Sequence, residues 1–271
     1  MPELPEVETT RRGIEPALKQ HRVLEVVVRE RRLRWPVPKD FESRLIGERV
    51  LAVERRAKYI LIRVASGTVI LHLGMSGSVR LVKPDTPPRK HDHVDFVMDS
   101  GWVVRFHDPR RFGSLSFTAE DPERHQLLKN LAPEPLSAKF DGDYLFRITR
   151  KRKVAIKQLI MNSQLVVGVG NIYASEALFR ARISPKRVAC RISAAEAEKL
   201  AKAIKTVLAA AVKIGGTTLR DYVNADGEAG YFKQRLYVYE RAGAQCRVCK
   251  APVKQFTQGQ RSTYWCTICQ R

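Results

Sequence analysis

Four of the five cysteines lie at the carboxyl end of the chain, in two Cys-x-x-Cys pairs that residues 250–265 separate. They are Cys246, Cys249, Cys266 and Cys269. Two pairs at this spacing are typical of a zinc site in which four thiolates surround the metal and leave no position for water. We therefore expect one structural Zn²⁺ in a carboxyl-terminal ribbon. A disulfide framework is the alternative.

Two further residues are interpreted from this pattern. A turn near Gln258-Gly259 would place Arg261 beside the tip of the ribbon, where a solvated hairpin arginine is the alternative to a functional one. The fifth cysteine, Cys190, has no other cysteine near it in the sequence, so we interpret it as a passive thiol.

The charge of the chain points to a polyanionic partner. Lysine and arginine number 49 against 28 aspartate and glutamate residues, which gives a formal net charge of +21. Nucleic acid is the expected partner, although a ribosomal or anionic-membrane protein would carry a similar charge. No stretch reaches the roughly 18 apolar residues of a membrane span, and four glutamates among the first twenty residues are unlike a secretion signal. We expect a soluble cytoplasmic monomer, associated with the nucleoid and not with a membrane.

The amino-terminal half is predicted to be mostly antiparallel β-sheet after a short helix from Pro5 to about Leu18. Strands are expected at 22–29, 51–61, 68–73, 78–83, 93–98 and 102–107, with a hairpin turn at Asp99-Ser100-Gly101. In this interpretation Lys58 lies on the more polar face of a single strand, where a solvated lysine is the ordinary role. Arg55 and Arg56 nearby would lower its pKa.

Helical spacing is expected from about Asp121 onward, and it is clearest in Ala194 to Ile214. Ser193 and Glu196 are placed as a capping box, and Gly215-Gly216 would end that helix. The chain is therefore predicted to be an α+β protein with a β-sandwich domain over 1–131, a helical domain over 132–236 and a zinc ribbon over 237–271. Residues 132–143 are the expected linker.

The amino terminus suggests chemistry. If Met1 is removed, Pro2 presents a secondary amine that can attack a sugar C1′ and form an iminium ion, an electron sink for later strand cleavage. Glu3 is adjacent and can protonate a leaving group. Plain capping of the helix that Pro5 begins is the alternative for these acidic residues.

Motifs spread over the whole chain resemble those of the bacterial formamidopyrimidine-DNA glycosylase family. They are Pro2-Glu3-Leu4-Pro5-Glu6-Val7-Glu8, Ala57-Lys58-Tyr59, His72-Leu73-Gly74-Met75-Ser76-Gly77, Lys90-His91-Asp92-His93, Asp108-Pro109-Arg110-Arg111-Phe112-Gly113, Gly168-Val169-Gly170-Asn171-Ile172-Tyr173-Ala174-Ser175-Glu176 and the cysteine pairs. The resemblance implies a β-sandwich, a helix-two-turn-helix domain and a zinc ribbon around a DNA-binding cleft. It also implies base-excision repair of oxidised purines such as 8-oxoguanine and formamidopyrimidines in damaged double-stranded DNA, followed by β,δ-elimination.

The resemblance further implies roles for single residues. Pro2 would form the Schiff base, Glu3 would donate a proton for base release, Lys58 would assist β-elimination and Arg261 would assist δ-elimination. His91, Arg110 and Arg152 would hold DNA.

The residues themselves add four candidates for DNA binding. Met75 and Phe112 lie in expected turns, where they would unstack a duplex while Arg110 fills the vacated space. Asn171 begins a helix whose backbone N–H groups could bind a phosphate. Simple turn formation explains Gly168 and Gly170 before it equally well. Lys157 follows the basic run Arg150-Lys151-Arg152-Lys153, which is either a solvated face or part of a phosphate track.

Three other expectations remain open on the sequence. The glycine-bearing region 215–230 could close over an extruded base. A related endonuclease for oxidised pyrimidines is the nearest alternative function, and Leu4 together with Met75, Arg110 and Phe112 fits the purine enzyme better. A zinc-ribbon nucleic-acid-binding protein without chemistry would explain the charge and cysteines but not Pro2-Glu3.

Overall fold

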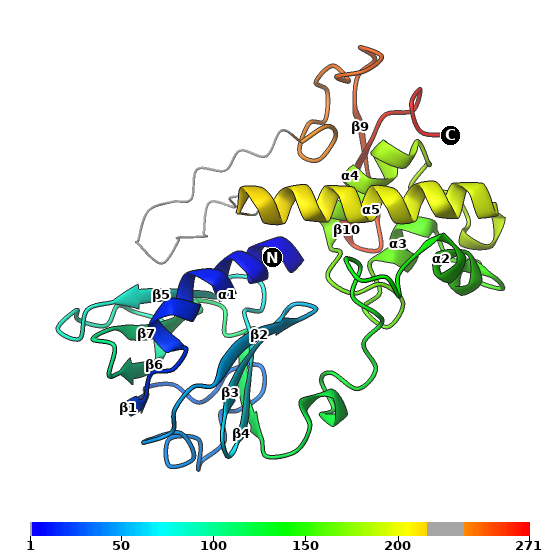
Figure 1. The fold of residues 1–271 in the computed structure, drawn as a ribbon. Helices are drawn as coiled ribbons and strands as arrows, with labels where there is room; N and C mark the ends of the chain where they lie inside the picture. Colours follow the sequence, from blue (N-terminus) through cyan, green and yellow to red (C-terminus); the bar gives the residue numbers. More distant parts are fainter. Residues whose placement is uncertain (1, 216–235) are drawn as a thin grey trace. The chain divides into compact units, whose positions relative to one another are not determined.

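The computed structural model describes residues 2–215 and 236–271, which form two compact units (Figure 1). Of the described residues, the first unit contains those up to Asn130 and Gly215, and the second comprises Leu131–Ile214 and the carboxyl-terminal residues from 236 on. Met1 and most of the region 215–230, where we expect a closing loop, lie outside the described residues. The division into three domains at 131/132 and 236/237 stays a prediction.

Two four-stranded antiparallel sheets make up most of the first unit. One sheet has the order β1 (Val23–Val28), β6 (Asp92–Met98), β7 (Val103–His107), β5 (Ser78–Val82), and the other β2 (Ala52–Arg56), β3 (Tyr59–Val64), β4 (Gly67–His72), β8 (Ser114–Thr118). Apolar side chains of both sheets, such as Ile62 and Phe106, share one buried core with Val7 and Ile14 of α1 (Leu4–Leu18). The expected antiparallel β-sandwich is confirmed, and β8 is a strand that the sequence analysis missed.

The region around Lys58 differs from the expectation of one strand over 51–61. The chain reverses at Ala57-Lys58, so that Arg56 of β2 pairs with Tyr59 of β3. Ala57 has φ of +54°, in the left-handed region that residues other than glycine rarely adopt. Without Gly, Asn or Pro the sequence contains no turn signal here. Lys58 therefore lies in a hairpin turn and not on a strand face.

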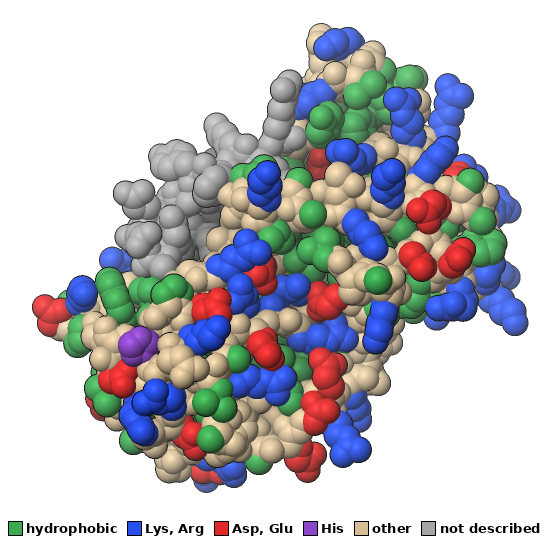
Figure 2. Space-filling view, viewed as in Figure 1, with side chains coloured by type: hydrophobic (Ala, Val, Ile, Leu, Met, Phe, Trp, Pro, Cys, Tyr) green, Lys and Arg blue, Asp and Glu red, His purple; other side chains and the backbone are tan. Residues whose placement is uncertain are grey.

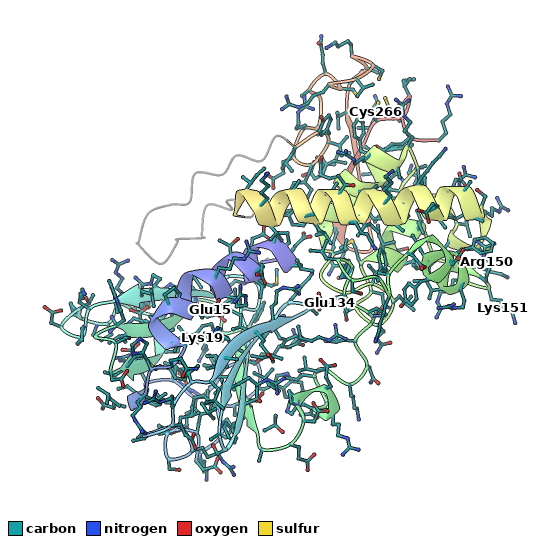
Figure 3. The ribbon with its side chains drawn as sticks, in the orientation of Figure 1. Glu15, Lys19, Glu134, Arg150, Lys151 and Cys266 are labelled. Atoms are coloured by element: carbon teal, nitrogen blue, oxygen red, sulfur yellow. The ribbon has the colours of Figure 1, made fainter. Side chains whose placement is uncertain are left out.

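Helix α1 begins immediately after the first two described residues. Glu3 is its N-cap, Pro5 lies in its first turn, and the backbone N–H of Glu3 donates to Glu6 Oε2 at 2.9 Å. Further along the helix, Glu15 and Lys19 pair one turn apart at 3.6 Å (Figure 3). The helix is thus fixed at its start by reciprocal capping and on its outer side by ion pairs.

The second unit contains the helices and a two-stranded ribbon. Its elements are α2 (Gly142–Thr149), α3 (Ile156–Ile160), α4 (Asn171–Ala181), a 3₁₀ turn at Ala189–Arg191, α5 (Ala194–Ile214), β9 (Lys254–Gln258) and β10 (Arg261–Trp265). Helix α5 packs on α2 and α4. A Cβ atom at Gly142 would lie 2.7 Å from Glu198 Cα, so only glycine allows this approach. None of the described helices is long and apolar enough to cross a membrane.

The start of helical structure is later than expected. A short 3₁₀ helix at Pro122–Arg124 follows Asp121, but the first α-helix after the sheets is α2, and the residues between are turns and irregular chain. Helix α5 has the predicted bounds. Its capping box is also as predicted, because Glu196 N–H donates to Ser193 Oγ at 3.2 Å and Ser193 N–H donates to Glu196 Oε2 at 2.9 Å.

Replacing Ser193 with alanine should reduce the free energy of unfolding of the second unit by about 1 kcal/mol, because one N–H of the first turn of α5 loses its acceptor. Urea unfolding followed by circular dichroism measures the change. Ser163→Ala is the matched control, since Ser163 is exposed and its side chain has no hydrogen bond among the described residues. Equal effects of the two substitutions would contradict a capping role.

Candidate functional site

Pro2 and Glu3 lie buried at the amino-terminal end of α1. Glu3 is only 2% exposed. Its carboxyl group accepts the backbone N–H of Glu6 in the capping box of α1, and it is a group that can take part in proton transfer. The geometry therefore places a potential acid directly beside residue 2, at the end of a helix that the β-sandwich core holds in place.

A single arginine connects α1 with the turn that carries Lys58. Arg55 Nε donates to Glu8 Oε2 of α1 at 3.1 Å, and Arg55 Nη1 donates to the carbonyl oxygen of Ala57 at 2.9 Å. Burial alone would raise the pKa of Glu8, but hydrogen bonds from Arg11 and the charge of Arg55 outweigh it and lower that pKa. Glu8 is thus a stable anion that fixes Arg55, and Arg55 fixes the turn.

The two arginines that precede Lys58 in the sequence both pair with carboxylates. Arg55 faces Glu8, and Arg56 pairs with Glu123 at 3.1 Å. The expected effect of these two arginines on the pKa of Lys58 stays a prediction.

His72, at the end of β4, is a candidate that the sequence analysis did not single out. Its ring centroid lies 4.7 Å from that of Tyr59, the residue after Lys58. Burial, and then the positive charges of Lys58 and Arg34, lower the pKa of His72 to about 4. Its Nδ1 accepts the backbone N–H of Gly74 at 3.0 Å, so the neutral ring carries its proton on Nε2. His72 is therefore a neutral hydrogen-bond donor in the neighbourhood of Lys58.

The loops that carry Met75 and Phe112 are in direct contact. A Cβ atom at Gly74 would lie 2.4 Å from the backbone nitrogen of Gly113, so this crossing requires glycine, which also adopts φ of +68° there. The carboxylate of Asp108 is fully buried, and it accepts hydrogen bonds from Ser76 Oγ at 2.8 Å and from the backbone N–H of Gly113 at 2.7 Å. These contacts hold the two loops as one body.

Four predicted DNA-binding residues meet on this loop pair. Met75 is 44% and Phe112 39% exposed, as expected for apolar side chains in turns. The Arg110 guanidinium lies over the Phe112 ring, 4.6 Å from its centroid. The carbonyl oxygen of His91 accepts the N–H of Asp108 at 3.0 Å, which places His91 beside the same loops.

Lys157 and Asn171 lie in the second unit, where they join α3 and α4 to the ribbon strand β10. Lys157 Nζ donates to Asn171 Oδ1 at 2.6 Å and to Thr263 Oγ1 at 2.7 Å, and Asn171 Nδ2 donates to the Ser262 carbonyl at 2.9 Å. Lys157 is only 2% exposed. The expectation that Lys157 extends a surface track of cations is therefore wrong. It supports Asn171 and the strand that begins with the exposed Arg261.

The basic run after α2 is only partly a solvated face (Figure 3). Arg150 packs over the Phe146 ring at 4.1 Å and donates to the Ile192 carbonyl, whereas Lys151, Arg152 and Lys153 are exposed. Lys and Arg side chains are numerous on the face that Figure 2 shows, as the net charge requires. Arg152 therefore remains available for an anionic partner.

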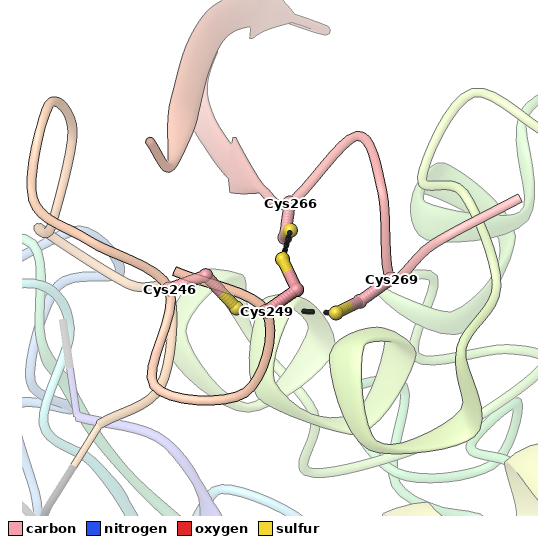
Figure 4. A group of neighbouring side chains, drawn as sticks. All are labelled: Cys246, Cys249, Cys266 and Cys269. Atoms are coloured by element: carbon pink, nitrogen blue, oxygen red, sulfur yellow. Dashed lines mark hydrogen bonds between the residues drawn. The ribbon is translucent and has the colours of Figure 1, made fainter. Parts of the chain in front are cut away.

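The four ribbon cysteines converge on one point (Figure 4). Their Sγ atoms all lie within 4.8 Å of one another, with Cys249 and Cys266 3.3 Å apart and Cys246 and Cys269 3.9 Å apart. Zn–S bonds of about 2.3 Å in a tetrahedron place sulfurs about 3.8 Å apart, which fits this arrangement. No disulfide forms among these cysteines. Four sulfur ligands complete the shell, so this is a structural zinc site.

The thiols require a cation in order to ionise together. Burial, and then the hydrogen bonds from neighbouring thiols, raise the pKa of Cys269 to about 12. Bound Zn²⁺ stabilises thiolates directly and removes this obstacle.

Glu176 of α4 holds the segment that leads into the ribbon, and the sequence analysis did not assign it a role. Its carboxylate accepts the backbone N–H groups of Tyr237, Val238 and Tyr239 at 2.8, 2.9 and 3.0 Å. Burial raises the pKa of Glu176, although the three N–H groups act in the opposite direction. This carboxylate fixes the ribbon to α4 independently of the metal.

Purified protein should contain about one zinc per chain, and Cys249→Ala should lose the metal and the ordered ribbon, because metal binding and ribbon folding are coupled. Metal analysis together with amide NMR signals of β9 and β10 measures both. Cys190→Ala is the control and should keep its zinc. Folded protein with well under one zinc per chain, or an ordered ribbon in Cys249→Ala, would contradict the assignment.

The His72 ring should titrate near pH 4 in the folded protein, against 6.5 for an unperturbed histidine. Since the folded pKa is the lower one, the contribution of the neutral ring to stability is complete above about pH 6.5 and is lost as pH falls through 4. Ring ¹⁵N NMR measures the midpoint. In Lys58→Met the midpoint should rise but stay below 6.5, because burial is the largest cause. A wild-type midpoint near 6.5 would show that the ring is solvated.

Comparisons with known proteins agree with this geometry over the whole chain. The formamidopyrimidine-DNA glycosylase N-terminal domain matches residues 1–115, and the H2TH domain of the same glycosylases matches residues 131–223. Formamidopyrimidine-DNA glycosylases of Thioalkalivibrio sulfidiphilus and Methylococcus capsulatus are 60% and 58% identical to this chain over 271 residues, with 100% of each chain covered.

Solved structures give the same result. The MutM (Fpg) protein of Thermus thermophilus superposes with a TM-score of 0.89 at 39% identity, covering 99% of this chain and 98% of that chain. Lactococcus lactis Fpg in complex with DNA that contains an abasic site superposes with a TM-score of 0.90 at 29% identity, covering 99% of both. On these matches, the chain belongs to the formamidopyrimidine-DNA glycosylase family.

Proposed function

We propose that this protein is a base-excision repair glycosylase and abasic-site lyase that removes oxidised purines, 8-oxoguanine and formamidopyrimidines, from damaged double-stranded DNA. The observation that carries the proposal is the burial of Pro2 and Glu3 together at the start of α1, which supports roles for Pro2 as the nucleophile and for Glu3 as the acid. The related Lactococcus lactis structures contain DNA with an abasic site or with Fapy-dG, which supports this substrate class.

The chemistry begins once Met1 has been removed. The Pro2 nitrogen attacks C1′ of the damaged nucleotide, the bond from C1′ to the base breaks, and Glu3 supplies a proton that leaves with the base. The bond from C1′ to the ring oxygen O4′ then breaks, the proton of the Pro2 nitrogen passes to O4′, and an iminium ion forms between Pro2 and C1′. This cation accepts the electron pair released when a C2′ proton is removed, and the 3′ phosphate leaves in β-elimination. Lys58 assists this step, and Arg261 assists the second, δ-elimination.

The remaining candidates hold the DNA open. Met75 and Phe112 enter the stack while Arg110 occupies the space of the extruded nucleotide, which exposes C1′ for attack. His91, Arg152 and Asn171 bind phosphates, Lys157 positions Asn171, and the Nε2–H of His72 adds a neutral donor near Lys58. The zinc site holds the ribbon rigid around Arg261. The enzyme acts as a monomer in the cytoplasm, on nucleoid DNA.

The two alternative functions, an enzyme for oxidised pyrimidines and a binding protein without chemistry, predict different activities on DNA. An enzyme for oxidised pyrimidines would have the same nucleophile, and Met75, Arg110 and Phe112 favour the purine enzyme over it. In a binding protein without chemistry, Glu3 would serve only as the N-cap of α1, and Pro2 would have no role as a nucleophile. Duplexes with 8-oxoguanine, with an oxidised pyrimidine and with no lesion separate the three.

Glu3→Gln should slow release of 8-oxoguanine by roughly 10²- to 10⁴-fold, the usual contribution of a positioned general acid. Cleavage of a duplex with a pre-formed abasic site should fall much less, because no base has to leave. Single-turnover rates on the two duplexes measure the difference. Glu120→Gln removes an exposed carboxylate of the same unit and should leave both rates unchanged. Equal losses of Glu3→Gln on both duplexes would contradict the acid role.

A further inference from the structure

A cavity of about 420 Å³ opens beside the loop pair in the first unit, and it has no part in the reaction steps proposed for Pro2, Glu3, Lys58 and Arg261. It is lined by Ser76, Ser78, Arg80, Arg89, His107, Pro109 and Arg110. Ser78 of β5 and His107 of β7 are paired across the sheet, so the floor of the cavity is fixed by strand pairing. A cavity of this size accommodates more than a water cluster.

The floor carries uncompensated hydrogen-bonding capacity. The side chain of Arg80 is 9% exposed, and its Nη2 donates to Asp92 Oδ1 at 2.7 Å. Arg80 Nε is buried and has no hydrogen-bond partner among the residues that the structure describes. The same Asp92 oxygen also bonds His107 Nδ1 at 2.8 Å. One carboxylate thus serves both basic groups of the floor.

The rim adds two positive charges. Arg89 and Arg110 are exposed, and neither forms a salt bridge within residues 2–215 or 236–271. Arg89 lies just before β6, where its backbone N–H donates to Asp92 Oδ2 at 2.7 Å, so the start of its side chain is fixed while the guanidinium stays available. Three arginines and two serines thus line the cavity, and the hydroxyl of Ser76 also donates to Asp108 at 2.8 Å.

We infer that this cavity is a phosphate-binding site, and that it takes a backbone phosphodiester of the DNA that Met75, Arg110 and Phe112 engage. Arginine forks and hydroxyls are the donors that bind phosphate oxygens, and a single phosphodiester supplies the negative charge that the cavity lacks. Arg110 belongs to both the cavity and the loop pair, which places the phosphate next to the opened stack. The assignment to DNA rests on the proposed function, whereas the phosphate chemistry does not.

The test compares two arginine substitutions in the first unit. Arg89→Gln removes a rim charge without touching the buried Asp92 network. Arg49→Gln is the matched control, because Arg49 is exposed and lies away from the cavity. The backbone of Arg49 forms a β-bridge with that of Arg22, next to the end of the sheet where Val23 pairs with Met98. The cavity lies at the opposite end, where Asp92 pairs with His107. Binding of undamaged duplex is measured over a salt series for each protein.

Arg89→Gln should make the log-log salt slope shallower by about 0.9, the value for one phosphate contact, while Arg49→Gln leaves it unchanged. Arg89→Lys should restore the slope, since lysine still binds phosphate as a point charge. An unchanged slope in Arg89→Gln, or an equal change in Arg49→Gln, would overturn the site.

A second arm separates DNA phosphate from a free anion. Inorganic phosphate replaces chloride at constant ionic strength while the His107 ring is followed by NMR. No shift, together with the shallower slope, assigns the site to backbone phosphate. A shift in wild type that Arg89→Gln abolishes shows that the site also takes free phosphate. Because undamaged duplex requires no chemistry, failure of the Pro2 mechanism would leave these results intact.

Discussion

The bond from Arg55 to Glu8 is the contact on which the arrangement of the catalytic candidates in the first unit depends. Glu8 belongs to α1, which begins with Glu3, and the same arginine holds the carbonyl of Ala57 beside Lys58. Arg11 of the same helix adds a second polar link, because its Nη1 donates to the carbonyl oxygen of Val53 in β2 at 3.1 Å. An arginine that donates one hydrogen bond to a carboxylate and another to a backbone carbonyl fixes both the distance and the direction between them, which a contact of apolar side chains does not.

Buried polar groups perform the same task elsewhere in the molecule. Asp108 joins the loops of Met75 and Phe112, Lys157 joins α3 and α4 to β10, and Glu176 joins α4 to the segment before the ribbon. Each lies between segments that are distant in sequence, and each is a single side chain with two or more partners. Loss of one partner would leave a buried polar group without one of its hydrogen bonds, which makes these arrangements specific.

Local patterns predicted much of this structure. The cysteine spacing, the sheet-forming runs and the capping box of Ser193 and Glu196 each depend on residues that are close in sequence. The sequence alone therefore predicts them. The turn at Ala57-Lys58 was missed because its left-handed residue is alanine, which contains no turn signal. Lys157 was predicted to be exposed because it follows a basic run. The sequence pattern is the same whether such a lysine contacts solvent or, as here, Thr263, which lies 106 residues away. Glu176 was missed for the same reason, since its acceptor role depends on N–H groups 61 to 63 residues along the chain.

Borohydride reduction during reaction with 8-oxoguanine duplex tests the role of Pro2 as the nucleophile most directly. We expect a covalent protein–DNA adduct, a protein mass that lacks Met1, and peptide mapping that places the adduct on Pro2. An amino-terminal tag that survives processing should abolish the adduct, because the Pro2 nitrogen is then an amide. Efficient trapping by the tagged protein, or an adduct mapped to Lys58, would contradict the assignment of Pro2 as the nucleophile.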